Sequence, residues 1–573
     1  MQMHNAASGS NSASGLAHGA ADQLDVGTWG PSLKQPRSDI GHRRLLIPLA
    51  LTALYVAQCF WFIGTQSMCY DEPGHLDAGL SIWRHGDYTV PPGDHPPLQR
   101  VLGSVILAAA GTVASPEAGA HRVDLEPERS MWLSRPLIVL LGLLLAWLLW
   151  ANCKRWFSES AANFALALFA ISPEVIGHYS VVTTDGAGAL SIFLLSLALA
   201  NWWLSSTTRN AVLLGFAAGV ALLAKFYAIP LVLLVFVLVL IRRSGERPPG
   251  FLRSNWRAAM VIASLAVLIV WAGYSFHTGW LTIVDHKVLI PGLEARRLWP
   301  FPLAIHVSVP VPAPEFVVGA AYLSWHNELG HPTFLLGRIT QHGWLLYYPI
   351  VMLLKWPVII LGIALVGGYL LWRHKTGPPG ILFVVPGAFL AIAILLGHIQ
   401  IGVRHLLPVY PFLLVLAAAA WQFSGSSRQK IALLVLAGFQ LLDTARHAPN
   451  QISYFNVFVP ERSVYRIVTD SNVDWGLGLL AVREYQQQHP DEALYIQEGG
   501  LPFEPYGIRA RRLHPGQRVA GTVIVSPTDL SGQFEKNPKA YQWLLKYPIT
   551  AVLDHSLYVF KVPAESEQSV PRQ

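Results

Sequence analysis

The stretch "MCYDEPGH" (68–75) places two adjacent carboxylates, Asp71 and Glu72, beside His75 at the end of a long apolar run. A carboxylate can act as a general base when it lies within hydrogen-bond reach of the proton it removes. The stretch is therefore a candidate reaction centre, and the rest of the chain must supply its partners.

Other ionisable residues also stand at the ends of apolar runs. Such residues are costly in a membrane and often mark function there. Each alone could be a helix cap, an interfacial anchor or part of an ion pair, such as Asp185 with Arg404. Because these residues are expected to converge on one face of a helical bundle, the set as a whole favours a functional site over separate structural roles. Its further members are His95, His178, Asp185, Arg404 and His405.

This combination of charges fits one kind of sugar transfer better than another. A glycosidase needs one carboxyl group as acid and a second as base or nucleophile. A sugar carried on a polyprenyl phosphate leaves behind a phosphate anion, which needs cations rather than an acid. One carboxylate then serves as the base for an acceptor hydroxyl, and basic residues hold the phosphate. Arg404, Lys225 and Lys355 are the candidates.

The composition indicates that the positioning elements are membrane helices. The chain has 573 residues, of which 53% are hydrophobic and only 13% charged, against about 25% charged in a soluble domain. Its 20 tryptophans suit two membrane interfaces, and a net charge of +7 is typical of basic cytoplasmic loops rather than of a nucleic-acid surface.

The apolar runs predict about eleven membrane-spanning helices. The first, at 45–64, is long enough to span and does not read as a cleaved signal, because a signal has a shorter core. Arg43 and Arg44 before it predict a cytoplasmic N-terminus and so an external Asp71. The later runs are predicted after Arg135 and at 162–176, 180–204, 211–226, 228–241, 257–275, 344–372, 379–398, 405–423 and 430–443.

The segments between and beyond these runs complete the expected domain plan. Residues 1–42 are rich in Ser, Gly, Ala and Asn, which predicts a disordered cytoplasmic tail. Residues 43–443 form the predicted transmembrane catalytic domain, with external loops at 65–134 and 276–343. From 444 to 573, short strand-like runs and a helical segment at 478–489 predict a small external α/β domain. A short interfacial helix is expected around 75–88.

The cysteines do not suggest a metal or redox centre. Cys59, Cys69 and Cys153 are neither a disulfide framework nor spaced as metal ligands. Paired carboxylates could hold a divalent ion, but a hard ion would want further oxygen ligands. We therefore expect no metal or other cofactor to be required.

Several motifs together resemble the GT-C glycosyltransferases, and in particular the phospholipid-carrier-dependent branch that includes protein O-mannosyltransferases and aminoarabinose transferases. The first external loop carries "YDEPGH" and "HGDYTVPPGDHPPL", and "SPEVIGHYSVVTTD" resembles the second acidic loop. Similar motifs follow at 330–357, in "GVRHLLPVYPFL" and in "YFNVF…DSNVDWG". The resemblance covers roughly residues 45 to 480. Where many relatives continue "GQDL", this chain has Leu477, Gly478 and Leu479.

The resemblance implies an inverting transfer of one sugar from a polyprenyl-phosphate donor to a hydroxyl of a protein, lipid or envelope glycan outside the membrane. Asp71 matches the family's catalytic aspartate, Glu72 its acidic neighbour and Asp185 the acidic residue of the second loop. His75, His95 and His178 would line the pocket, although interface histidines held by hydrogen bonds are an equal reading. Asp470 and Asp474 are expected to brace the outer domain.

Two other classes stay open at this stage. The chain could be a transporter or flippase for a lipid-linked sugar, but no internal repeat is visible and the charges lie at span ends. It could also be a scaffold in envelope assembly, in which Asp71 would be replaceable. The expected partners are the lipid-linked donor, an acceptor and the bilayer, with no nucleic acid. The expected location is the plasma or inner membrane, if the chain is prokaryotic.

Overall fold

The structure, a computed structural model, describes residues 45–90, 95–112, 126–242, 255–284, 287–289, 296–297 and 307–564. The predicted disordered tail at 1–42 lies outside the described residues. So does most of the predicted cytoplasmic loop between 242 and 257.

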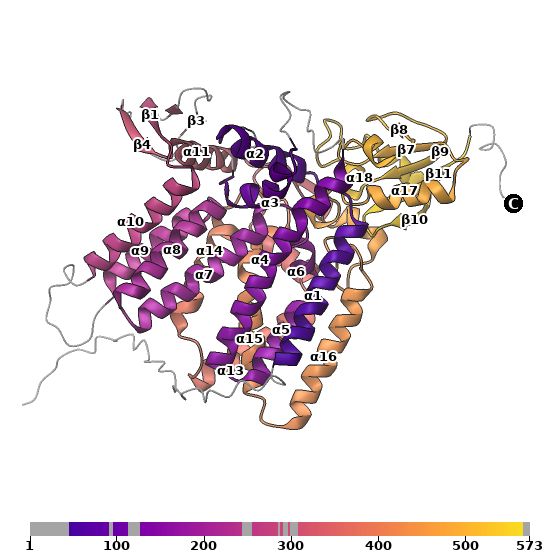
Figure 1. Cartoon of the computed structure of the whole chain (residues 1–573). Coiled ribbons are helices and arrows are strands. Elements are labelled where there is room, and N and C mark those ends of the chain that lie inside the picture. The colour runs from indigo at the N-terminus through magenta and orange to yellow at the C-terminus, as the bar shows by residue number, and fades with distance from the viewer. Residues whose placement is uncertain are drawn as a thin grey trace, which may run out of the picture.

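A bundle of long apolar helices forms most of the described chain (Figure 1). Among the described residues, five helical segments are long and apolar enough to cross a membrane, and a bent pair makes a possible sixth. These are α1 (Leu46–Thr65), α4 (Pro127–Trp156), α7 (Thr184–Leu204), α10 (Trp256–Gly273), the segment Val403–Gln422, and the pair α12 (Tyr347–Lys355) with α13 (Val358–His374). The chain is thus a multi-pass membrane protein.

The bundle has an apolar exterior as well as an apolar core. In α1, the buried residues Tyr55, Cys59 and Phe62 fall on one face at helical spacing. Large apolar side chains elsewhere point outward, such as Leu365 and Trp372 on α13, which are 75% and 68% exposed. Exposed apolar surface of this kind suits contact with lipid rather than water.

Each of the eleven predicted runs contains a helix, but whether the helices outside those six segments cross the bilayer stays a prediction. Helix α15 (Tyr410–Gln422) is part of the segment Val403–Gln422. The bundle is completed by α5 (Glu159–Ala170), α6 (Pro173–His178), α8 (Thr208–Ala224), α9 (Ala228–Ile241), α14 (Val384–Leu396) and α16 (Ser427–Ala445).

One end of the bundle carries the elements that hold the predicted site (Figure 1). Helix α2 (Glu72–His85) begins with Pro73 in its first turn and ends at Gly86, whose φ of 65° suits a left-handed helix cap. It packs closely on α3 (Leu98–Ala109): a Cβ on Gly79 would lie 2.3 Å from the Arg100 carbonyl oxygen. The helix expected around 75–88 thus forms, and Gly79 lets it approach α3.

A small sheet and a helix also lie at this end, in the segment predicted only as an external loop. The strands run in the order β3-β2-β1-β4 and are antiparallel. Their bounds, with the neighbouring elements, are β1 (Thr278–Val284), β2 (Lys287–Leu289), β3 (Arg296–Arg297), β4 (Val307–Pro312), α11 (Pro314–Leu329), β5 (Thr333–Leu335) and β6 (Arg338–Thr340).

The C-terminal residues form a five-stranded sheet in the order β10-β11-β9-β7-β8, with β7 parallel to both of its neighbours. Residues of β9 alternate between two apolar cores, Val523 and Val525 on one face and Ile524 on the other, as the period of a strand requires. The elements are α17 (Leu479–Gln488), β7 (Leu494–Gln497), β8 (Arg511–Arg512), β9 (Gly521–Val525), α18 (Pro527–Ser531), β10 (Ile549–Leu553) and β11 (Leu557–Val562). The main strands form where the sequence predicts them; an independent domain outside the membrane stays a prediction.

Candidate active site

Asp71 stands directly before the first turn of α2. The positive end of the helix dipole favours a carboxylate there. Its Oδ2 lies 3.4 Å from Arg404 Nη1, and its side chain keeps 32% of its surface exposed. Asp71 is therefore both paired with a cation and accessible from the surface of the molecule.

Asp185 lies in the first turn of α7 and is buried. Its Oδ2 accepts a hydrogen bond from Arg404 Nη1 at 3.1 Å, and its Oδ1 pairs with the ammonium group of Lys225, at the end of α8. The Asp185–Arg404 ion pair weighed in the sequence analysis is confirmed. It does not exclude a site, because Asp185 here joins two cations.

Arg404 joins these carboxylates from the other half of the chain. It lies in the short helix η4 (Val403–Val409) and contacts Asp71 and Asp185 through the same nitrogen, Nη1. Its Nε donates to Ser471 Oγ at 2.9 Å, and its guanidinium lies 4.0 Å from the centre of the Trp475 ring. An arginine held by a hydroxyl and an aromatic face is fixed in direction as well as in charge.

The segment that supplies Ser471 and Trp475 is itself held by the C-terminal residues. Asp470 takes a φ of 66°, uncommon for a residue other than glycine. Its Oδ1 accepts from the Ser471 amide at 2.6 Å and its Oδ2 from Gln533 Nε2 at 3.1 Å. Burial raises the pKa of Asp470 to about 7. The predicted bracing role of Asp470 thus has a geometric basis.

The predicted pocket histidines divide into two groups. His75 accepts a hydrogen bond from Arg100 Nε at 3.3 Å, and its ring packs edge-on against His95 at 5.1 Å between centroids. His178 lies on α6, where its Nε2 is 3.3 Å from a carboxylate oxygen of Glu174, and its ring is 6.2 Å from that of Trp475. His178 thus shares a packing partner, Trp475, with Arg404.

Two further predicted residues, His405 and Lys355, form hydrogen bonds to other residues of the chain. His405 Nδ1 lies 3.4 Å from the Tyr348 hydroxyl. Lys355 is buried and donates to the carbonyl oxygens of Ile452, at 2.7 Å, and Asn472, at 2.5 Å. The structure therefore does not bring Lys355 into the group formed by Asp71, Asp185, Lys225 and Arg404.

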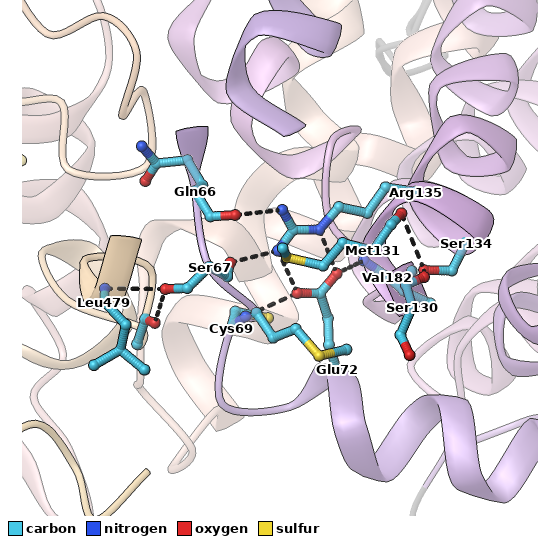
Figure 2. Close-up of polar contacts among 12 residues, drawn as sticks. Gln66, Ser67, Cys69, Glu72, Ser130, Met131, Ser134, Arg135, Val182 and Leu479 are labelled. Carbon is cyan, nitrogen blue, oxygen red and sulfur yellow. Dashed lines mark hydrogen bonds and ion pairs between the residues drawn. The ribbon is translucent and has the colours of Figure 1, made fainter. Parts of the chain in front are cut away.

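Glu72 differs sharply from the neighbouring Asp71. It is fully buried, and its carboxylate faces Arg135 of α4, with Arg135 Nη2 at 2.7 Å from Oε2 (Figure 2). Each carboxylate oxygen also accepts a backbone amide, from Cys69 and from Val182, both at 2.8 Å. Its acceptor positions are filled from within the protein, which leaves none for a substrate proton.

The sequence reasoning missed several contributors to this region. Arg135 and Arg100 are arginines within apolar segments, and their cost in a membrane was a usable signal. Trp475 and Ser471 sit in the "DSNVDWG" motif, but nothing in the letters shows that they face Arg404. Tyr348, the partner of His405, carried no distinguishing signal.

Comparison with protein families supports the resemblance for part of the chain. Residues 127–274 match the family described as dolichyl-phosphate-mannose-protein mannosyltransferase. The resemblance to GT-C transferases is confirmed over these residues. The matched segment includes Arg135, Asp185 and Lys225. A search of curated proteins found no match to the chain.

The chain is also similar to solved structures, among them two of ArnT and one of the Pmt1-Pmt2 complex. ArnT from Cupriavidus metallidurans in the apo state is 15% identical, covers 91% of this chain and 99% of its own, and has a TM-score of 0.46. The same protein bound to undecaprenyl phosphate gives 15% identity, 89% and 97% coverage and a TM-score of 0.46. The S. cerevisiae protein O-mannosyltransferase Pmt1-Pmt2 complex bound to the sugar donor is 10% identical. The match covers 72% of this chain and 90% of that one, with a TM-score of 0.48.

Proposed function

We propose that the chain transfers a sugar from a polyprenyl-phosphate carrier to an acceptor hydroxyl at the outer face of the membrane, with inversion at the anomeric carbon. The observation that carries the proposal is the meeting of a partly exposed carboxylate, Asp71, with a buried arginine, Arg404, which a second carboxylate also holds. The matched family, whose members are named for a lipid-phosphate sugar donor, supports the same reaction class.

In this mechanism Asp71 is the general base. Its carboxylate oxygen takes the proton of the acceptor hydroxyl. At the same time, the hydroxyl oxygen of the acceptor attacks the anomeric carbon from the face opposite the phosphate. The bond from the anomeric carbon to the phosphate oxygen breaks, and its electron pair stays on the phosphate. The products are the glycoside and free polyprenyl phosphate.

The cations stabilise the negative charge that develops on the leaving phosphate. Lys225 pairs with Oδ1 of Asp185 and Arg404 with Oδ2, so we propose that Asp185 orients both cations without reacting itself. A fixed cation needs little reorganisation as charge appears on the leaving oxygen. We propose that His405 assists at the phosphate and that His75, His95 and His178 shape the surroundings.

We revise two predicted roles within this proposal. We assign Glu72 to support rather than to catalysis, because Arg135 and two backbone amides occupy its oxygens. We assign Lys355 to support as well, because its ammonium bonds backbone carbonyls. We also propose that no metal is required; among the described residues, no cluster of three or more His, Cys, Asp or Glu could hold one.

The deciding experiment supplies purified protein, in lipid nanodiscs and in sealed vesicles, with radiolabelled polyprenyl-phosphate sugars and with acceptor-containing membrane extract. We expect release of free polyprenyl phosphate together with a labelled acceptor, and loss of both with Asp71→Asn. A transporter would instead move intact donor across sealed vesicles, with no release of carrier. If no donor in the panel is cleaved and intact donor is translocated, the transferase proposal is wrong.

A further inference from the structure

A buried ion pair connects the two loops that carry the acidic residues of the site. Glu72 Oε1 accepts from Arg135 Nε at 2.9 Å and from the amide of Val182 at 2.8 Å. Its Oε2 accepts from Arg135 Nη2 at 2.7 Å and from the amide of Cys69 at 2.8 Å. Figure 2 shows the carboxylate enclosed by these donors. We call Glu72 and Arg135 the acidic-loop clamp.

The two amides that the clamp holds belong to different loops. Cys69 stands two positions before Asp71, and Val182 stands three positions before Asp185. Asp71 and Asp185 then meet at the same atom, Arg404 Nη1. One carboxylate therefore fixes both loops whose acidic side chains converge on the arginine.

Arg135 extends the clamp to the end of α1. Its Nη1 donates to the carbonyl of Gln66 at 3.1 Å and its Nη2 to that of Ser67 at 2.6 Å. These carbonyls follow the last turn of α1, where a cation is favoured by the helix dipole. Ser67 in turn donates its hydroxyl to the Gly476 carbonyl at 2.7 Å, next to Trp475. The clamp thus reaches the segment that packs on Arg404.

We propose that Arg135 is a positioning residue: through Glu72 it sets the distance between Asp71 and the Asp185–Arg404 pair. This inference rests on the proposed transferase function. Arg135 and Glu72 have fully buried side chains, so neither can touch a substrate. Displacing a reacting group by about 1 Å can lower a rate by about 10²-fold, so a clamp of this kind acts on rate rather than on affinity.

A purely structural pair would behave differently, and a double replacement separates the two cases. Removing one partner leaves an uncompensated buried charge, which is strongly destabilising, whereas removing both charges is often tolerated. The variants are Glu72→Gln, Arg135→Gln and the double variant, with Arg135→Lys as the conservative replacement. The matched control is Glu128→Gln on the same helix, which removes an exposed pair with Arg483.

The first measurement does not depend on activity. Hydrogen–deuterium exchange of peptides covering 67–72 and 180–185 is followed in each variant in nanodiscs. We expect both peptides to exchange faster together in Glu72→Gln and in the double variant, and to be unchanged in Glu128→Gln. Unchanged exchange in both peptides would show that Glu72 does not hold the two loops, whatever reaction the protein performs.

The second measurement uses the transfer assay with its donor and compares kcat with KM. We expect the double variant to regain the melting temperature that each single variant loses, yet to keep a kcat about 10²-fold below wild type, with the KM for donor changed less than threefold. Arg135→Lys should recover only part of the rate, because it cannot form the same fork. A double variant that regains both stability and kcat would overturn the positioning role. A wild-type protein without transfer would instead refute the proposed function and leave the exchange result as the test of the clamp.

Discussion

Neighbouring residues of like chemistry have opposite environments here. Asp71 has a partly exposed side chain beside Arg404, and Glu72 is enclosed by Arg135 and two amides. For Asp71→Asn, which keeps the shape and removes the proton acceptor, we predict a rate loss of about 10²–10⁴-fold. Protein level should be unchanged, because one partly exposed carboxylate adds little stability. A radiolabel transfer assay measures this, with Asp491→Asn as a surface control; near wild-type transfer by Asp71→Asn would remove it from catalysis.

Arg404 leads to a second prediction at this scale. A guanidinium can hold two phosphate oxygens together, and an ammonium cannot. Arg404→Lys keeps the charge but also loses the Nε bond to Ser471. We predict that kcat/KM at limiting donor falls about tenfold or more, since one hydrogen bond to a charged group contributes about 1.5–3 kcal/mol. Titration with donor checks this against Arg446→Lys, a control at an exposed arginine side chain. Wild-type behaviour of Arg404→Lys would place the phosphate elsewhere, with Lys225 next in line.

The residue types of the site were predictable, but their partners were not. "YDEPGH" marks Asp71 and Glu72 equally, and what separates them is Arg135, 63 positions away. Likewise Lys355 looks like a phosphate ligand in sequence, yet the carbonyls that hold it come from about 100 positions further on. Long-range partners of this kind are set by packing, which one sequence does not display.

At the scale of elements, apolar runs predicted the helices well because lipid imposes helical hydrogen bonding on them. The bend of 111° between α12 and α13 was not predicted: the run at 344–372 reads as continuous, although Pro357 stands at the break. The β1–β4 sheet was also missed, since short strands within a long loop give only weak patterns.

An acidic residue at the carboxyl end of β7 gives an element-scale prediction through its titration. Glu498 follows β7 and is 3% exposed. Burial and the neighbouring Asp474 raise the pKa of Glu498 well above 4.5, and burial raises that of Asp474 to about 6. An acid with a higher pKa in the folded chain binds a proton on folding. Its stabilising contribution is present below the unfolded pKa and is lost as the pH rises through the folded one.

Glu498→Gln should therefore stabilise the sheet at pH 8 and change little at pH 4.5. The expected gain at pH 8 is about 1 kcal/mol or more, since one pKa unit corresponds to about 1.4 kcal/mol. Glu492, which precedes β7, gives a control of opposite sign. Lys561 and Thr522 lower the pKa of Glu492, so Glu492→Gln should slightly destabilise the fold at pH 8. Melting curves and exchange of β7 peptides at both pH values measure this. A stability gain for Glu498→Gln that is equal at both pH values would contradict the titration argument.

At the scale of the whole molecule, the site draws on segments spread along the chain. Asp71 comes from the segment between α1 and α2, Asp185 and Lys225 from the central helices, Arg404 from η4, and Trp475 from the segment before the C-terminal sheet. Figure 1 places α2, the β1–β4 sheet and the C-terminal sheet at the same end of the bundle. A lipid-borne donor and an external acceptor can meet only if that end faces outward, so the mechanism depends on orientation.

The basic loops predict that orientation, and the prediction can be tested directly. Arg43, Arg44 and the loop from 242 to 257 should be cytoplasmic, so Gly250→Cys should resist an impermeant thiol reagent in intact cells and react after permeabilisation. Lys536→Cys, exposed beside the C-terminal sheet, should react in intact cells. The native background should be low, because Cys59, Cys69 and Cys153 are all buried. Labelling of Gly250→Cys from outside, with protection of Lys536→Cys, would invert the topology. Asp71 and Arg404 would then face the cytoplasm, and a transfer on the outer face would be ruled out.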